Sequence, residues 1–146
     1  MYTTTFIQEK FGLKSNTLHY YIKAGAIVPD IDPGRGTGTK RLLSEINVME
    51  CVILKNLLSI SLPKAVIVYF FKTIRKPYWE RSLLDPSKIV SEKANLTLYF
   101  YTAGPEGEIT YGIYKGPLDN KLFGENIFVT IVVDLTAIAK QVLKYL

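Results

Sequence analysis

The sequence predicts an α+β fold, in which a mainly helical N-terminal half precedes a small antiparallel sheet with a packed C-terminal helix. Apolar residues recur at helical spacing through residues 2–75, whereas they alternate with other residues from Leu96 to Thr102. A largely β-branched run covers residues 127–133, and an amphipathic pattern follows it. At 146 residues, 48% hydrophobic and 21% charged, the chain is globular in composition and has room for one ordinary domain or two small ones.

Two short helices are expected at the start of the chain. The hydroxyls of Thr3 to Thr5 are candidate N-caps for the first helix, and Gly12 can end it in a left-handed conformation. Ser15 is then expected to cap a second helix, which runs to about Ala24 and stops at Gly25.

The second helix has two chemically distinct faces. Its apolar face, which should lie against the core, consists of Leu18, Tyr21, Ile22 and Gly25 at the spacing of one helical face. Its other face consists of Asn16, His19, Tyr20 and Lys23. A helix with this hydrogen-bonding outer face has the length and chemistry to enter the major groove of duplex DNA.

A basic, glycine-rich segment covers residues 30–41. Gly34, Gly36 and Gly38 allow positive φ, and Arg35, Lys40 and Arg41 supply charge. A nucleotide-binding P-loop would need Gly-x-x-x-x-Gly-Lys-Ser/Thr after a strand, and this pattern is absent from the segment. A β-hairpin is the favoured interpretation.

Two longer helices are expected next. Ser44 should cap a third helix over about 45–59. Ser61 should cap a fourth, Leu62 to Ile74, with Pro63 in its first turn. Because the fourth helix is apolar nearly all round, we expect it to be buried on more than one side, by the second half of the chain or by a second subunit.

The second half of the chain is predicted to be rich in strands. Residues 77–86 should form a passage between the halves, followed by a short helix, Ser87 to Lys93. The strand over 96–102 should turn through Gly104 to Gly107 into a second strand, Ile109 to Tyr114.

The last strand and helix complete the expected sheet domain. Residues 127–133 should form a central strand covered on both faces. Asp134 should cap a final helix, whose apolar face consists of Leu135, Ile138, Ala139, Val142, Leu143 and Leu146. The predicted division is a helical domain over 1–76, a linker with a short helix over 77–94, and a small α+β dimerisation or effector domain over 95–146.

Charge is distributed unevenly between the two halves. The first 76 residues hold 11 of the 18 Lys and Arg residues but 5 of the 13 Asp and Glu residues, a net charge of +6, whereas the remainder carries −1. Basic charge confined to one half favours a polyanionic partner for that half.

Three stretches of the first half resemble the MerR family of transcriptional regulators. Thr17-Leu-His-Tyr-Tyr-Ile-Lys-Ala-Gly-Ala-Ile-Val-Pro29 is similar to the family signature Leu-Arg-Tyr-Tyr-Glu-x-x-Gly-Leu-Leu-x-Pro. Lys40-Arg-Leu-Leu-Ser44 resembles Tyr-Arg-x-Tyr-Ser at the end of the family's wing, and Leu58-Ser-Ile-Ser-Leu-Pro63 resembles its Gly-x-Ser-Leu step. The similarity covers about residues 2–75.

The resemblance implies a winged helix-turn-helix that binds double-stranded DNA as a homodimer, with the second helix in the major groove and the hairpin wing against the backbone. The residues expected to contact DNA are Ser15, Asn16, Thr17, His19, Tyr20, Lys23, Arg35, Lys40 and Arg41. Of these, Arg41 matches the family's wing arginine, and Ser15 and Thr17 lie where helix N-terminal amides can hold phosphate.

The chain also departs from the family pattern. His19 stands where the family has an arginine, so a fixed charge and a bidentate donor are missing there. Leu43 replaces the wing tyrosine, and no heptad repeat follows Ile74. Dimerisation would therefore use the fourth helix or the C-terminal sheet.

Two other functions stay open. One is an architectural DNA binder similar to phage excisionases, although the second half of this chain is long for such a protein. The other is a protein-interaction module that has lost DNA binding, which the His19 departure permits. An enzyme is not expected, because the sequence shows no nucleophile–histidine–carboxylate set and no metal-ligand cluster.

The remaining residues of interest carry weaker signals. Cys51 is expected to be a small core residue. The tyrosines of the second half are expected to be sheet surface or interface, with an effector pocket as the alternative: Tyr99, Tyr101, Tyr111 and Tyr114. No cofactor or metal is predicted. Without a long apolar run or a secretory signal, we expect a cytoplasmic protein with no membrane span.

Overall fold

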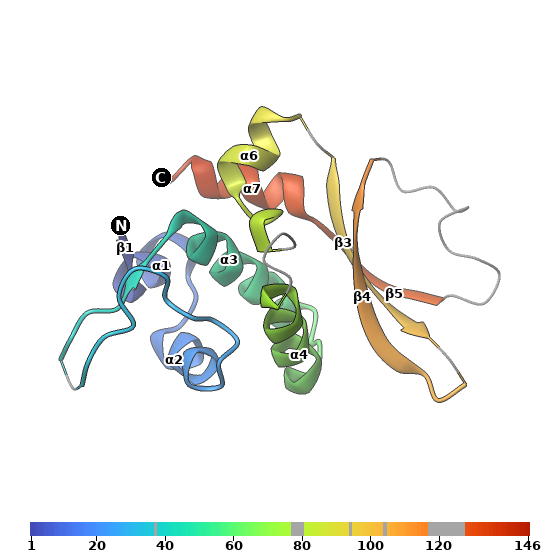
Figure 1. Ribbon diagram of the computed structural model, residues 1–146, viewed down its shortest axis with the longest axis horizontal. Coiled ribbons are helices and arrows are strands. Elements are labelled where there is room, and N and C mark those ends of the chain that lie inside the picture. Colours follow the sequence, from blue (N-terminus) through green and yellow to red (C-terminus); the bar gives the residue numbers. More distant parts are fainter. Residues whose placement is uncertain (37, 77–80, 94, 104, 117–127) are drawn as a thin grey trace.

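The computed structural model describes residues 1–36, 38–76, 81–93, 95–103, 105–116 and 128–146 (Figure 1). The first half contains β1 (Tyr2–Thr3), α1 (Thr4–Phe11), α2 (Ser15–Lys23), β2 (Leu42–Leu43), α3 (Glu45–Ser59) and α4 (Lys64–Arg75). The second half contains α6 (Pro86–Ser91), β3 (Leu96–Ala103), β4 (Glu108–Lys115), β5 (Phe128–Asp134) and α7 (Leu135–Leu143). The predicted α+β character is confirmed, and within the described residues no helix is long and apolar enough to span a membrane.

Local capping signals set several helix boundaries as predicted. The Thr3 hydroxyl accepts a hydrogen bond from the Phe6 amide at 3.2 Å, and Gly12 ends α1 at a φ of +71°. Ser44 caps α3 in a reciprocal capping box with Asn47. These side chains satisfy backbone groups that a helix end leaves without intrahelical partners.

Two predicted caps are wrong. Ser15 is the first residue of α2, and Lys14 occupies the N-cap because its carbonyl accepts the first helical bond, from Leu18 at 3.0 Å. Ser61 does not cap α4, which begins after Pro63. Ser61 instead has a φ of +58°, and its amide donates to Leu58, so it closes the end of α3.

The small sheet of the first half differs from the predicted hairpin. β2 pairs antiparallel with β1 at the N-terminus, with Tyr2 opposite Leu43. The described part of residues 30–41, which we call the basic loop, has a single bridge, between Asp32 and Leu42. Pro33 has no amide to donate, and the loop glycines have positive φ, so the loop cannot sustain a ladder.

The second sheet is antiparallel, with the strand order β4-β3-β5. The alternation predicted for β3 is confirmed, since Leu96, Leu98 and Phe100 are buried. The prediction of a central strand over 127–133 is wrong, because β5 is an edge strand and Val132 is 49% exposed. Residue 127 lies outside the described residues, as does Gly104 at the start of the predicted turn between β3 and β4.

Helix α4 is amphipathic rather than apolar all round. It buries Ile67, Phe70, Phe71 and Ile74 along one face, whereas Tyr69 is 50% exposed. The chain's own sheet covers the buried face, since the Phe70 ring centroid lies 5.6 Å from that of Phe100 and 4.8 Å from that of Tyr111. The expectation that the second half of the chain covers this helix is therefore confirmed.

The C-terminal helix brings the end of the chain back to the first half. The Asp134 carboxylate caps α7 and accepts a hydrogen bond from the Ala137 amide at 2.9 Å. α7 packs against α6 and α3 as well as β3, so it does not lie on the sheet alone (Figure 1). The Tyr145 ring lies 5.4 Å from that of Phe11 in α1. Leu146 was predicted to lie on the buried face of the final helix, but it follows the end of α7 and is exposed.

The passage between the halves begins with residues 77–80, which lie outside the described residues. The short helix after it is shifted from the predicted range, because the Asp85 carboxylate accepts from the amides of Ser87 and Lys88 and starts α6 at Pro86. One cluster of buried side chains contains residues of both halves, from Ile7 to Val142. The division of the chain into two domains stays a prediction.

Candidate nucleic-acid interface

An open groove of about 720 Å³ lies between the start of α1, the exposed face of α2 and the basic loop. It is lined by Thr3, Thr4, Thr5, His19, Lys23, Gly34, Gly36, Gly38, Thr39, Lys40 and Arg41. The groove brings together four of the nine site residues that the sequence predicts: His19, Lys23, Lys40 and Arg41. No carboxylate is among its described lining residues, so the groove favours an anion.

One wall of the groove consists of Thr3, Thr4 and Thr5, and the pairing of β1 with β2 places it beside the basic loop. Thr3 lies in β1 opposite Leu42, which directly follows the two loop cations. Thr4 and Thr5 form the first turn of α1, which contains no acidic residue. The partial positive charge of a helix N-terminus is therefore not neutralised locally on this side of the groove.

The exposed face of α2 forms the opposite wall and extends beyond it. The four predicted outer-face residues, Asn16, His19, Tyr20 and Lys23, are all exposed, whereas Leu18 and Tyr21 are buried. Ser15 and Thr17 are half-buried at the start of the helix, where the N-cap residue Lys14 makes no side-chain cap. The helical period thus predicted the orientation of α2 correctly.

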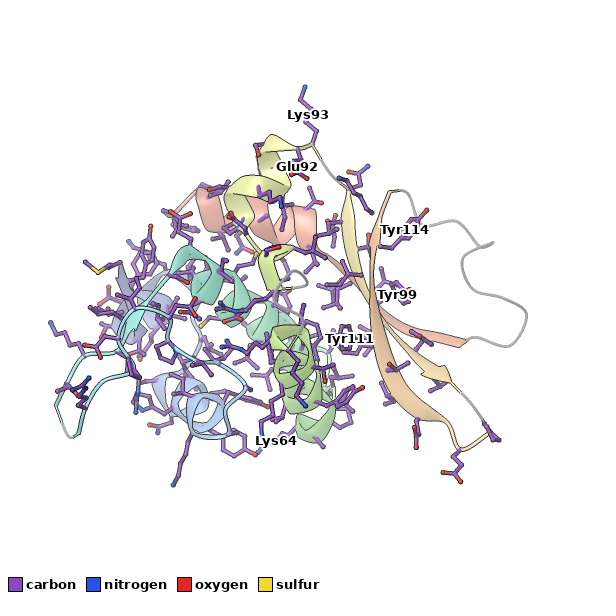
Figure 2. All side chains as sticks on the ribbon, in the orientation of Figure 1. Lys64, Glu92, Lys93, Tyr99, Tyr111 and Tyr114 are labelled. Atoms are coloured by element: carbon purple, nitrogen blue, oxygen red, sulfur yellow. The ribbon has the colours of Figure 1, made fainter. Side chains whose placement is uncertain are left out.

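Helix α4 adds a cation to this surface that sequence reasoning missed. The Lys64 ammonium lies 5.1 Å from the centre of the Tyr20 ring, a cation–π distance, and Figure 2 shows Lys64 at the N-terminal start of α4. The Tyr20 ring also packs edge-on against Tyr21, at 5.0 Å between centroids. Because the contact joins residues 44 apart in the chain, local spacing carried no signal for it.

The side-chain stem of Arg41 lies beside Gly34 of the basic loop. Gly34 has a φ of +75°, and its amide donates to the Asp32 carboxylate at 2.9 Å. A Cβ at Gly34 would lie 3.2 Å from Cγ of Arg41, so a larger residue would press on the arginine stem, and the positive φ also favours glycine there. Arg35 is exposed but is not among the residues that line the groove.

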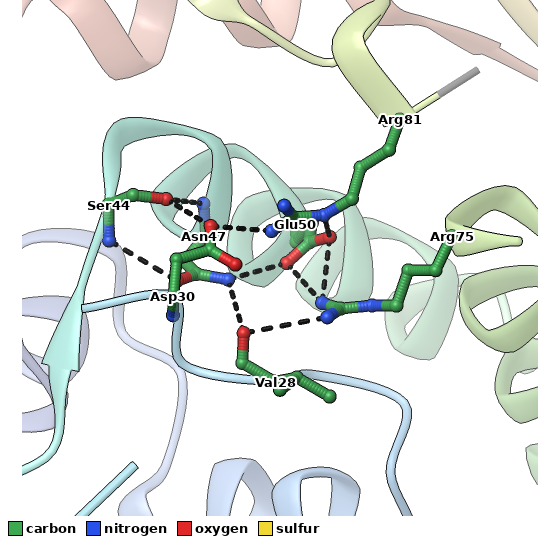
Figure 3. Close-up of polar contacts among 7 residues, drawn as sticks. All are labelled: Val28, Asp30, Ser44, Asn47, Glu50, Arg75 and Arg81. Atoms are coloured by element: carbon green, nitrogen blue, oxygen red, sulfur yellow. Dashed lines mark hydrogen bonds and ion pairs between the residues drawn. The ribbon is translucent and has the colours of Figure 1, made fainter. Parts of the chain in front are cut away.

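The buried amide of Asn47 joins the two ends of the basic loop (Figure 3). Its Oδ1 accepts hydrogen bonds from the amides of Asp30, at 2.8 Å, and Ser44, at 3.2 Å. Its Nδ2 donates to the Val28 carbonyl at 2.9 Å and to Glu50 Oε2 at 2.8 Å. One α3 side chain thus fixes the backbone on both sides of the loop.

Glu50 lies next to Asn47 and is fully buried. Arg75 donates to both of its carboxylate oxygens, and Arg81 donates to Oε1 at 3.0 Å. Arg81 also reaches Asp30, with 2.6 Å between Nη2 and Oδ2. Burial raises the pKa of the Glu50 carboxyl, and the two guanidinium groups oppose this shift because they stabilise the charged form.

Sequence reasoning missed this ionic network, although one signal for it was present. Glu50 stands between Met49 and Cys51 in an apolar stretch, and an acidic residue on a buried helix face requires a cationic partner. Cys51 itself is buried, as predicted, and burial raises the pKa of its thiol.

The four tyrosines of the sheet do not form one site. Tyr111 packs against Phe70 on the side of the sheet that faces α4. Tyr99 and Tyr114 point to the other side (Figure 2), and the Tyr99 ring lies against Gly112 and 5.5 Å from the ring of Tyr101. Because strand residues alternate between faces, these side chains divide between the two sides of the sheet.

The chain matches no protein-family model, and no curated protein shows significant similarity to it. The function therefore has to be argued from the groove, the helix beside it and their charges.

Proposed function

We propose that this chain is a DNA-binding transcriptional regulator of MerR-like type, in which α1 and α2 form a helix-turn-helix and the basic loop takes the place of the wing. The observation that carries the proposal is the groove with Lys23, Lys40 and Arg41 on its walls and no carboxylate in its described lining. A phosphate backbone is the polyanion that suits an open, cationic groove of this size.

The position of α2 supports duplex DNA over a smaller anion. The exposed face of α2 continues from the groove with Asn16 and Tyr20, so hydrogen-bonding groups extend along the helix beyond the groove. The major groove of B-DNA admits one α-helix, and asparagine can read an adenine edge through two hydrogen bonds. In this arrangement α2 reads bases and the loop cations hold the adjacent backbone.

Selection of bound fragments from the source genome, followed by anisotropy titrations on the selected duplex, tests the proposal. Affinity should fall with salt, with a slope of about −0.9 in log K against log [salt] for each neutralised phosphate. Asn16→Ala should relax the preference among sequences by about 1–3 kcal/mol at one position, because a base contact is lost. Absent or salt-independent binding by the folded chain would contradict the proposal.

One observation favours a second candidate, a protein-interaction module built on the same surface. His19 supplies no permanent charge at the position where the family that this chain resembles has an arginine. If the folded chain binds no duplex, this candidate gains support. A regulator of this type is also expected to be a dimer, which the molar mass in solution would test.

A further inference from the structure

The basic loop is held by a residue from far along the chain. Arg81 follows the end of α4 by six residues and precedes the turn into α6, yet its guanidinium lies at the base of the loop (Figure 3). Its Nε donates to the buried Glu50 at 3.0 Å, and its Nη2 donates to Asp30 at 2.6 Å.

We propose that Arg81 is a positioning residue for the groove, one that makes the placement of the loop cations depend on the segment leading to the second half of the chain. The inference rests on the proposed function for its effect on DNA binding, whereas its effect on the loop is independent of any ligand.

The two carboxylates that Arg81 contacts differ in their burial and in the number of other partners that hold them. Glu50 has no solvent exposure and is also held by Arg75 and Asn47, so it is a fixed anchor. Asp30 is 29% exposed in its side chain and is the first residue of the loop. Asn47 holds the Asp30 amide, and Arg81 ties the partly exposed Asp30 carboxylate to the buried Glu50.

Other groups in the network cannot replace this link. Arg75 reaches Glu50 and the Val28 carbonyl, the latter at 3.5 Å, but Arg81 is the guanidinium that bonds Asp30 among the described residues. The Ser44 hydroxyl also donates to Asp30, at 2.6 Å, but Ser44 follows β2, just past the far end of the same loop. Ser44 therefore closes the loop and does not connect it to the second half.

The segment that carries Arg81 is built to hold it. The Leu84 amide donates to the Arg81 carbonyl at 3.0 Å, and the Asp85 amide donates to Ser82 at 3.2 Å. Asp85 then caps α6, which packs against α7 and α3. A change in the second half that shifts this turn would withdraw the guanidinium from Asp30, leave the loop cations less ordered, and raise the entropic cost of binding a polyanion.

Limited proteolysis of the unliganded chain tests the link directly. Trypsin cuts after Arg35, Lys40 and Arg41, all within the loop. We expect Arg81→Gln and Asp30→Asn each to speed loop cleavage by about tenfold, within the range that residues along a coupling route produce. Cleavage after Lys140, in α7, should stay unchanged, because a generally destabilised chain would be cut at both places.

Two control variants match the changes in charge. Lys88→Gln removes one positive charge from the exposed face of α6, and Asp32→Asn removes one negative charge from the loop while keeping the acceptor for the Gly34 amide. Neither should speed loop cleavage. Asp30→Asn leaves the bonds of Glu50 to both arginines in place but also weakens the Ser44 bond to the same Asp30 oxygen. Arg81→Gln keeps the Ser44 bond, so faster loop cleavage in both variants assigns the effect to the Arg81 link.

Titration of the selected duplex completes the test. Arg81→Gln should weaken binding several-fold more than Lys88→Gln but keep the wild-type salt slope, since no groove cation is lost. If trypsin cleaved the loop of Arg81→Gln and of Asp30→Asn no faster than that of the control variants, the inference would be overturned, whatever the wild-type chain binds. Failure of the wild-type chain to bind any duplex would instead overturn the proposed function, while the cleavage rates would still decide the role of Arg81.

Discussion

The Arg75 guanidinium donates from Nη2 to both oxygens of Glu50, at 2.7 and 2.9 Å, although the Glu50 side chain has no exposure to solvent. Arg75 ends α4 and Glu50 lies in the middle of α3, so the ion pair joins the two longest helices of the first half. Transfer of two charged groups from water into the protein is costly, and this cost offsets much of their mutual attraction. Loss of one partner is nevertheless strongly destabilising, because it leaves the other charge buried without that compensation.

Arg75→Met should therefore lower the free energy of unfolding by about 3–5 kcal/mol at neutral pH, since it leaves Glu50 buried with one guanidinium. Chemical denaturation followed by circular dichroism measures the loss. Lys72→Met is the matched control, because Lys72 is an exposed cation on the same helix. Its effect should be within about 0.5 kcal/mol of zero.

The loss in Arg75→Met should also depend on pH. Burial already raises the pKa of Glu50, and removal of Arg75 raises it further because an opposing cation disappears. A carboxyl with a raised folded pKa contributes its full stability below the unfolded pKa, about 4.3, and loses it as pH rises. The variant should approach wild-type stability near pH 4, and an equal deficit at pH 4 and pH 7 would contradict this account.

A second prediction concerns Gly34. Gly34→Ala should destabilise the basic loop by about 1–2 kcal/mol through its positive φ, and its Cβ would also press on the Arg41 stem. Duplex affinity should fall because the Arg41 side chain is displaced. Gly36→Ala is the control, since Gly36 also has a positive φ but has nothing within 4 Å of a Cβ. Equal losses of affinity in the two variants would show that backbone strain alone is responsible.

The elements that the sequence predicted well are those specified by neighbouring residues. The Ser44 cap of α3 and the exposed face of α2 depend on residues within one or two helical turns. The strand over 127–133 was placed wrongly in the sheet because a continuous apolar run is compatible with a central strand and with an edge strand that packs against helices.

The parts of the site that were missed depend on contacts between distant residues. Arg81 meets Asp30 across 51 positions of sequence, and Lys64 meets Tyr20 across 44. The basic loop illustrates the same limit in another way. Its glycines and cations were evident in the sequence. The order of strands alone did not reveal that β2 pairs with the N-terminal β1, and that within the described residues a single bridge, from Asp32 to Leu42, joins β2 to the other side of the loop.

A third prediction separates groove cations from other loop cations. Arg41→Ala should weaken binding to all duplexes about equally and reduce the salt slope by about 1, as expected for one lost phosphate contact. Arg35→Ala removes the same charge from the same loop, but Arg35 does not line the groove. Anisotropy titrations at several salt concentrations should therefore show a smaller change for Arg35→Ala. Equal changes would mean that the overall loop charge matters and the groove does not.

The last prediction follows from the burial of Cys51. Burial raises the pKa of its thiol, with a further contribution from the nearby Glu50 carboxylate. The folded pKa lies above the unfolded value of about 8.5, so the stability from this group is complete below that pH and declines above it. Above the unfolded pKa, this thiol alone should lower the free energy of unfolding by up to about 1.4 kcal/mol for each pH unit. Denaturation of the wild type and of Cys51→Ala between pH 8 and pH 10 measures the effect. The variant should lose stability less steeply than the wild type as pH rises. Parallel pH profiles would instead show that other groups account for the loss of stability at alkaline pH. Tyr21 is one such group, because burial also raises its pKa.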